Sequence, residues 1–268
     1  MIVFPNAKIN IGLRIVEKRP DDFHNLQSCF YPVGWSDMLE VVPADAFMFS
    51  SSGLPIPGPV DANLCVRAYD LLKADFDLPP VHLHLHKIVP IGAGLGGGSA
   101  DAAFALGVLN DRFELELDET LLENYARRLG SDCAFFIKNR PVYCVEKGDV
   151  FETIAVDLSG YYILLVYPNL AVSTAEAYAA IRPRRPETSL RDDLQRPIDT
   201  WRTTVSNDFE ASLFPKYPVL AQTKQLLYEA GAVYASLSGS GSTVYGIFNA
   251  PVSSPNQFKE YSVWQGKL

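Results

Sequence analysis

Residues 90 to 103 read Pro-Ile-Gly-Ala-Gly-Leu-Gly-Gly-Gly-Ser-Ala-Asp-Ala-Ala, and five of the seven residues from Gly92 to Gly98 are glycine. Glycine weakens regular structure because its backbone loses more freedom on folding than that of any other residue. A flexible turn between two elements would need only one or two glycines. The density of glycine therefore favours a segment whose bare backbone binds something, although a plain turn stays open.

The glycine-rich segment lies between a predicted strand and a predicted helix. Residues 81–89 are apolar at every second position, which is typical of a half-buried strand. Ser99 is a good helix N-cap, and small and leucine residues recur at helical spacing from 102 to 109. The amides of the turn and the positive end of the helix dipole would face the same side, and this arrangement binds phosphate.

Two known motifs compete for the same segment. Gly92, Gly94 and Gly97 match the GxGxxG pattern of dinucleotide-binding folds, which leaves a dinucleotide-dependent oxidoreductase as an alternative. However, that motif usually opens a doubly wound sheet, and here about ninety residues of a different pattern come first. A Walker loop needs a lysine after its glycines, and none follows here. The segment therefore favours a nucleoside triphosphate site of another design.

The composition is that of an ordinary soluble globular protein. The chain has 268 residues, of which 48% are hydrophobic and 20% charged, and this length favours two modest domains over one large domain. A net charge of -8 argues against nonspecific nucleic-acid binding, which needs a basic surface. An anionic substrate must therefore be held by a few local cations, backbone amides or a metal ion.

The cysteines and the apolar runs predict a cytoplasmic protein. The four cysteines lie far apart without a CxxC pair, so we expect reduced, buried thiols. The N-terminus lacks the layout of a signal peptide, and apolar runs such as 161–167 are too short to cross a bilayer. We therefore expect no membrane association.

Residues 7–15 alternate strictly between apolar and other residues and predict a strand. Lys8, Asn10 and Gly12 share the face opposite the isoleucines. A lysine and an asparagine on such a face are more often solvated than catalytic. Gly12 suggests that something approaches the strand closely.

Phe23 and His24 lie in a charged loop, where they could stack on a planar ligand and hydrogen-bond to it. A loop aromatic packed into its own core is an equally good interpretation of Phe23.

Three histidines alternate along the strand before the glycines, at positions 82, 84 and 86. Alternating histidines can bind a metal ion, but no carboxylate or cysteine is visibly placed beside them. A solvated histidine face is therefore the favoured interpretation.

Two helices flank the glycine-rich segment in the sequence. Residues 61–73 predict an amphipathic helix with Asn63 at its cap position, and residues 119–129 predict another that ends at Gly130. Asp132 follows this glycine, and an aspartate in that place usually caps the next turn.

The C-terminal half begins with a predicted strand at 161–167. Residues 183–197, rich in Arg, Pro and Asp, predict a mobile surface connection. A second glycine-serine turn, Leu-Ser-Gly-Ser-Gly, lies at 237–241. Two such turns, one in each domain, suggest a ligand held where the domains meet.

The segment from Pro90 to Ser99 resembles the phosphate loop of the GHMP kinases, the superfamily of galactokinase, homoserine kinase and mevalonate kinase. The turn at 237–241 is similar to the C-terminal motif of that superfamily. Further motifs are similar to the members whose substrate carries a cytidine diphosphate group: Ala7 to Asn10, Phe23 to Gln27, Asn63-Leu64, Gly130 to Phe136, and Asn207 to Glu210. All of them are colinear, from residue 7 to residue 241.

The resemblance implies an α+β, two-domain GHMP kinase fold. Residues 1–157 would form a mixed α/β nucleotide-binding domain with the phosphate loop, and residues 158–268 a ferredoxin-like domain. It also implies a kinase that uses ATP with Mg²⁺ to phosphorylate an alcohol on a small molecule bearing cytidine diphosphate. Such a reaction depends on alignment and charge neutralisation more than on covalent chemistry.

The same resemblance implies roles for single residues. Asp132 would be the base that takes the proton from the substrate's 2-hydroxyl. Lys8 would be the cation that steadies this carboxylate and the developing alkoxide, and Asn10 would orient the same group.

Phe23 and His24 would hold the cytosine ring, with Tyr178 as a second stacking partner. Asn63 and Lys87 would border the adenosine. The residues around the ATP phosphates would be Pro90, Gly92, Gly94, Leu95, Gly96, Gly97, Gly98 and Ser99. No residue is assigned as a metal ligand.

The chain departs from the family pattern at three places, none of which removes a proposed catalytic group. Phe23 stands where the family usually has tyrosine, so a hydroxyl contact is lost while stacking remains. Ala100 replaces a frequent second serine of the loop, which puts a hydroxyl contact in doubt, and Ala134 replaces a proline near Asp132.

Two alternatives within nucleotide-binding proteins stay open. A GHMP kinase for a different small alcohol is the nearest, and the Phe23-His24 pair favours a cytidine substrate over it. A catalytically silent nucleotide-binding regulator is the other, and the presence of both Lys8 and Asp132 argues against it.

Overall fold

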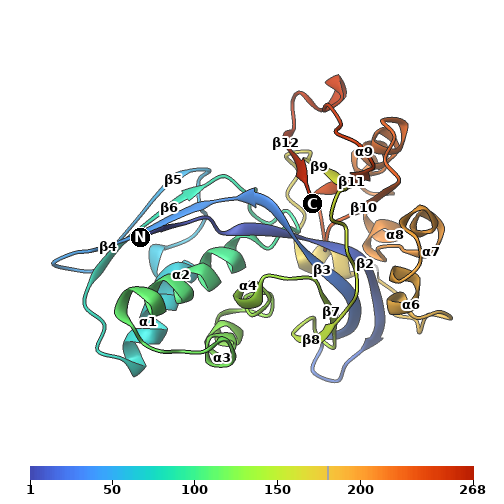
Figure 1. The fold of residues 1–268 in the computed structure, drawn as a ribbon. Coiled ribbons are helices and arrows are strands. Elements are labelled where there is room, and N and C mark those ends of the chain that lie inside the picture. The colour runs from blue at the N-terminus through green and yellow to red at the C-terminus, as the bar shows by residue number, and fades with distance from the viewer. Residues whose placement is uncertain (180) are drawn as a thin grey trace. The chain divides into compact units, whose positions relative to one another are not determined.

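The computed structural model describes residues 1–179 and 181–268, which divide into two compact units (Figure 1). The first unit comprises residues 1–7, 35–91 and 96–140. The second comprises residues 8–34, 92–95 and 141–268, so residues 8–34 and 141–157 group with the C-terminal half of the chain. The boundary between residues 157 and 158 stays a prediction.

The first unit is built on a four-stranded sheet of order β1-β4-β6-β5, in which only the β5–β6 pair is parallel. Val81, Leu83 and Leu85 are buried on one face of β6, as the alternating pattern predicts. Helices α1 and α2 lie on the same side of this sheet (Figure 1). The elements are β1 (Ile2–Val3), β4 (Met38–Pro43), β5 (Met48–Gly53), β6 (Val81–Lys87), α1 (Leu64–Asp75), α2 (Gly97–Phe113), α3 (Glu119–Leu129) and α4 (Phe135–Lys138).

The helix ends of the first unit follow the expected capping chemistry in two cases. The side chain of Asn63 accepts a hydrogen bond of 2.9 Å from the Cys65 amide at the start of α1, which confirms its predicted cap position. Helix α3 has the predicted bounds and ends at Gly130. The prediction that Ser99 caps α2 is wrong: Gly96, with a left-handed φ of 70°, takes the cap position, and Ser99 lies inside the first turn.

The second unit contains two four-stranded sheets, of order β2-β3-β7-β8 and β10-β11-β9-β12. The second sheet is antiparallel throughout, and α9 packs against β10 and β11. The strands of the second unit are β2 (Asn6–Lys18), β3 (His24–Ser36), β7 (Val142–Val145), β8 (Val150–Thr153), β9 (Tyr162–Tyr167), β10 (Tyr234–Leu237), β11 (Val244–Phe248) and β12 (Ser262–Lys267). Strand β2 begins in the first unit, and β3 ends there. The helices of the second unit are α5 (Thr174–Ala179), α6 (Leu190–Leu194), α7 (Trp201–Thr204), α8 (Phe209–Leu213) and α9 (Pro218–Glu229). The two units together confirm the α+β class.

The prediction of a mobile surface connection over residues 183–197 is wrong for its second half. Ser189 caps α6, and Leu190, Asp193 and Leu194 are buried there. Asp193 forms an ion pair of 2.7 Å with Arg14 of β2. The local composition is polar, but two leucines and this ion pair attach the segment to the second unit.

Gly12 has a φ of +66°, and a Cβ placed there would lie 2.7 Å from Leu190 Cδ1 and 2.9 Å from Val205 Cγ1. The close approach that the sequence suggests at Gly12 is therefore made by core side chains of the second unit.

The described residues contain no helix that is both long and apolar enough to span a membrane. All four cysteines are buried free thiols, as expected.

We expect Gly12→Ala to destabilise the protein more than Gly58→Ala. Both glycines have positive φ, so each substitution incurs the left-handed penalty of about 1–2 kcal/mol. Only Gly12 adds a clash, worth about 1–3 kcal/mol, because a Cβ at Gly58 meets nothing within 4 Å. Urea unfolding of the two variants measures the difference. Equal losses of stability would contradict the packing role of Gly12.

Candidate functional site

The residues predicted to form the site fall in both units, and each group is described within its own unit. Part of the glycine-rich segment, Gly92–Leu95, belongs to the second unit. Gly94 has a φ of +76°, and a Cβ there would lie 2.0 Å from the carbonyl oxygen of Ser238. The Ser238 hydroxyl donates a hydrogen bond of 2.8 Å to the Gly94 carbonyl. The two glycine-rich turns predicted from the sequence therefore pack directly on each other, and only glycine fits at this contact.

Lys8 and Asn10 lie on β2, and their side chains are buried, with relative exposures of 4% and 2%. The expectation that this strand face is solvated is therefore wrong. Lys8 Nζ donates to Asn10 Oδ1 at 2.5 Å and lies 4.2 Å from the centre of the Phe30 ring. Asn10 Nδ2 donates to the Ser28 hydroxyl at 2.9 Å. These contacts fix the ammonium of Lys8 in one place.

Lys8 and Asn10 are also joined to the glycine-rich turns through their backbones. The Lys8 amide donates to the Leu95 carbonyl at 2.9 Å, and the Asn10 amide donates to the Ser238 hydroxyl at 3.3 Å. The second unit therefore brings together Lys8, Asn10 and the central part of the glycine-rich segment.

His24 and Tyr178 lie together, as the resemblance implies. Their rings are stacked with centroids 4.8 Å apart, and Tyr178 packs edge-on against Phe209. Burial, and after it the charge of Lys18, lowers the pKa of His24 below its ordinary value of 6.5. The imidazole is therefore neutral at pH 7 and can both donate and accept hydrogen bonds.

Phe23 is 59% exposed and has the ammonium of Lys147 5.3 Å from its ring centre. The alternative that this loop aromatic packs into its own core is therefore wrong. One ring face of Phe23 meets a cation, and the side chain presents much of its surface to solvent.

In the first unit, the start of α2 lies close to the segment that contains Asp132. Ser99 hydrogen-bonds to the thiol of Cys133, whose pKa burial raises to about 11. A Cβ placed on Gly98, in the first turn of α2, would meet nothing within 4 Å. Open space therefore lies beside the backbone at the amino end of this helix, where an anion is favoured.

Asp132 is half-buried, and the Ser131 hydroxyl donates to its Oδ1 at 3.4 Å. The expected helix cap does not fall on Asp132, because the N-cap of α4 is Ala134. The Asp132 carbonyl accepts a bond of 3.3 Å from the Phe135 amide.

Lys87 ends β6, and its side chain is only 3% exposed. Its ammonium donates hydrogen bonds to Asp37 and, at 2.7 Å, to Asp101. Burial raises the pKa of Asp101 to about 7, although the charge of Lys87 opposes that shift. The side chain of Lys87 is therefore enclosed by carboxylates, while Asn63, the other residue predicted to border adenosine, is half-buried and caps α1.

His82, His84 and His86 are half-buried and bridged by the hydroxyls of Ser50 and Ser52 of β5, at 2.7–3.0 Å. Across residues 1–179 and 181–268, no three His, Cys, Asp or Glu side chains are grouped so that they could hold a metal ion. The histidine face is thus hydrogen-bonded rather than fully solvated.

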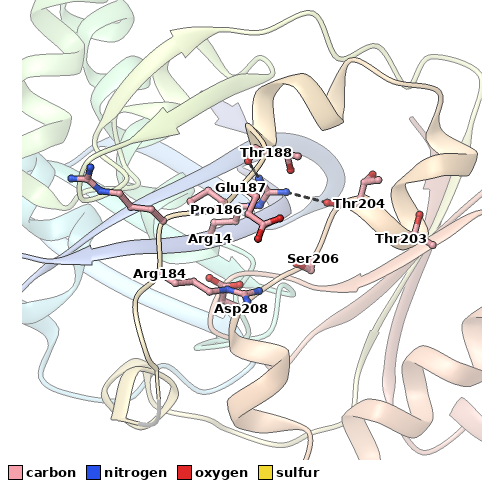
Figure 2. Close-up of a pocket in the computed structure, with 10 residues that line it drawn as sticks. Arg14, Arg184, Pro186, Glu187, Thr188, Thr203, Thr204, Ser206 and Asp208 are labelled. Carbon is pink, nitrogen blue, oxygen red and sulfur yellow. Dashed lines mark hydrogen bonds between the residues drawn. The ribbon is translucent and has the colours of Figure 1, made fainter.

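A cavity of about 420 Å³ in the second unit lies beside Arg14 (Figure 2). Arg14 donates to the carbonyls of Thr188 and Thr204 and pairs with Asp193. None of the residues predicted for the site is among those that line this cavity. Arg14 therefore acts as a structural link between β2 and the segment from 188 to 204.

Three residues that support the site were not predicted from the sequence. Ser238 lies in the quoted turn at 237–241, and Asp101 lies in the quoted stretch at 90–103, so both could have been singled out. Asp37, by contrast, stands alone between two strands and carries no sequence signal.

Two family models match the chain. The model described as "GHMP kinases N terminal domain" matches residues 63–140, and the model described as "GHMP kinases C terminal" matches residues 191–259. The chain belongs to the GHMP kinase family. This membership confirms the predicted family and its two-domain fold.

Among its relatives, the 4-diphosphocytidyl-2-C-methyl-D-erythritol kinase of Cytophaga hutchinsonii is 51% identical over 261 residues, which cover 97% of this GHMP kinase and 96% of the relative. The protein of the same name from Parabacteroides distasonis is 46% identical over 270 residues, covering 100% of both chains. A crystal structure of 4-(cytidine 5'-diphospho)-2C-methyl-D-erythritol kinase matches with a TM-score of 0.76 and 30% identity, covering 92% of this chain and 90% of that chain.

Proposed function

We propose that this GHMP kinase transfers the γ-phosphoryl group of ATP to the 2-hydroxyl of 4-diphosphocytidyl-2-C-methyl-D-erythritol, forming the 2-phosphate and ADP. The reaction serves the non-mevalonate route to isoprenoid precursors, and the enzyme acts in the cytoplasm. The observation that carries the proposal is the 51% identity to a relative of that name over 97% of this chain.

Asp132 is the proposed general base. A carboxylate at hydrogen-bond distance from the 2-hydroxyl takes its proton as the oxygen attacks phosphorus. Lys8 steadies this carboxylate and the alkoxide that develops on the substrate, and Asn10 orients the ammonium. The hydrogen bond from Lys8 to Asn10 supports this role, because a charge held in one place acts without reorganisation when the reaction occurs.

The glycine-rich segment from Pro90 to Ser99 is the proposed ATP phosphate site. The open space beside Gly98 and the amino end of α2 support this assignment. GHMP kinases use ATP, and the donors present fit Mg²⁺, which usually takes only one or two protein oxygens and otherwise keeps phosphate oxygens and water. Ser99 would supply a hydroxyl oxygen, and the ion would neutralise phosphate charge when bound. Asn63 and Lys87 stay assigned to the adenosine edge of the site.

The cytosine pocket is assigned to Phe23, His24 and Tyr178. The His24 and Tyr178 rings stack on each other, which supports a shared aromatic surface on which a base could stack, and the exposed Phe23 offers a further stacking face. A neutral His24 can pair with the hydrogen-bonding edge of cytosine. A GHMP kinase for another small alcohol would not need these three residues, so the substrate test below separates the two functions.

We expect Gly98→Val to weaken ATP binding strongly and Gly107→Val to leave it unchanged. Both glycines lie in α2 and both would place a Cβ in open space, so neither variant should disturb the fold. Only the side chain at residue 98 occupies the space proposed for phosphate. Titration calorimetry with ATP tests this, and equal ATP affinities in the two folded variants would refute the phosphate assignment.

We expect ATP-dependent phosphorylation of 4-diphosphocytidyl-2-C-methyl-D-erythritol, with homoserine, mevalonate and galactose inert, because only the first carries a cytosine. Phe23→Ala should raise the KM for this substrate and leave the KM for ATP unchanged. Phe4→Ala is the matched control, since Phe4 is similarly exposed, at 61%. ADP release is the measurement. If methylerythritol phosphate without the cytidine reacted as well, the pocket would be misassigned.

We expect Asp132→Asn to lower turnover by roughly 10²- to 10⁴-fold, because asparagine cannot take the hydroxyl proton. The urea midpoint should hardly change, since the side chain keeps its size. Asp118→Asn is the control: Asp118 caps α3 with a bond of 2.8 Å, and asparagine caps a helix about as well. Near wild-type turnover in a folded Asp132→Asn enzyme would exclude Asp132 as the base.

A further inference from the structure

Three ionisable side chains of the first unit are buried together where the glycine-rich segment begins and ends. Lys87, Asp37 and Asp101 have relative exposures of 3%, 0% and 3%. Lys87 is the last residue of β6, Asp37 lies between β3 and β4, and Asp101 is in α2 four residues after its start. We call these three residues the buried triad.

The buried triad binds the backbone that enters the loop. Asp37 Oδ1 accepts hydrogen bonds from the amides of Ile88 at 2.5 Å and Val89 at 2.8 Å, immediately before Pro90. Asp37 Oδ2 binds the ammonium of Lys87. One carboxylate therefore fixes both the last residue of β6 and the two residues that follow it.

The same ammonium reaches the helix that follows the loop. Lys87 Nζ donates to Asp101 Oδ2 at 2.7 Å. A Cβ on Gly97 would lie 3.0 Å from this nitrogen and 3.1 Å from Val89 Cγ1. The first turn of α2 thus lies directly against the triad, and Gly97 is needed for that approach.

The buried triad has an unfavourable desolvation free energy if its only role is to stabilise the fold. Burying an ion pair costs desolvation energy that its attraction often fails to recover, and apolar packing of the same volume is commonly as stable. Here two carboxylates share one ammonium, and Asp101 Oδ1 is buried without a hydrogen-bond partner in the part of the chain that the structure describes. Unlike apolar packing, the directional hydrogen bonds of the triad fix the orientation of the backbone on both sides of the loop.

We propose that Asp37, Lys87 and Asp101 are positioning residues for the nucleotide, which hold the entrance of the glycine-rich loop and the first turn of α2 in the geometry that phosphate requires. The inference rests on the proposed function in assigning this loop to ATP. It gives the ammonium of Lys87 a positioning role: the ammonium holds the loop, and the adenosine edge assigned to Lys87 is left to the rest of that residue.

The test removes the carboxylate of Asp101 from the triad. Asp101→Ala separates Lys87 from α2 but leaves the Lys87–Asp37 pair intact, so the buried ammonium keeps a carboxylate. A displaced loop end would misalign the amide hydrogen bonds to charged phosphate, and their loss should weaken ATP binding by roughly ten- to a hundredfold. The KM for the alcohol substrate should not change. Asp101→Asn should restore most of the affinity, because its amide oxygen still accepts from Lys87.

Glu123→Ala is the matched control, because Glu123 is also an acidic residue of the first unit, 8% exposed, and binds Arg127 and Lys138. Its loss should lower the urea midpoint and leave ATP binding unchanged. ATP dissociation constants from calorimetry and the two KM values are measured for each variant. Gly97→Ala, whose methyl group would press on Lys87, provides a second route to the same effect if Asp101→Ala does not fold.

The ATP dissociation constants, the KM values and the urea midpoints distinguish a positioning role of the triad from a purely structural one. Weaker ATP binding in Asp101→Ala that asparagine restores supports the proposal. A lower urea midpoint with unchanged ATP affinity overturns the proposal. An equal rise of the KM values for ATP and for the alcohol substrate also overturns it. A wild-type enzyme that binds ATP but phosphorylates no alcohol of the panel contradicts the proposed substrate, and the ATP dissociation constants still decide the role of the triad.

Discussion

A loop of glycines binds phosphate only if its amides are held in place, and glycine has no side chain with which to hold them. The glycine-rich segment therefore depends on contacts from elsewhere in the chain. In the second unit, the Ser238 hydroxyl donates to the Gly94 carbonyl, and the Ser238 carbonyl oxygen occupies the space where a Cβ of Gly94 would lie. In the first unit, Asp37 holds the residues before the loop, and Lys87 holds Asp101 after it.

The acidic composition of the chain makes the placement of positive charge important. Lys87 lies closest in sequence to the loop, yet its charge is matched by two carboxylates and cannot attract phosphate. In the proposed phosphate site, the attraction within the first unit would come from backbone amides and the amino end of α2. Local donors of this kind allow a protein of net charge -8 to bind an anion without a basic surface.

Local patterns predicted the elements of the fold well. The alternation before the glycines became β6, and the helix over 119–129 appeared with the predicted bounds. The same patterns failed where distant segments decide the outcome. An alternating strand shows which residues share a face but not what covers that face, so the burial of Lys8 and Asn10 was missed. The triad was missed for the same reason, since Asp37 and Lys87 are 50 residues apart.

The glycines of the loop are required for different physical reasons, although the motif presents them as one run. Gly94 admits the backbone of Ser238, where a Cβ would lie 2.0 Å from a carbonyl oxygen. Gly97 admits the ammonium of Lys87, and Gly96 adopts a left-handed conformation as the cap of α2. Gly98 alone among these three helix-start glycines has helical geometry and open space beside it. Packing therefore accounts for Gly94 and Gly97 and backbone conformation for Gly96. Neither reason applies to Gly98, and for that residue the proposed phosphate site supplies one, which is why the Gly98→Val variant tests the site most directly.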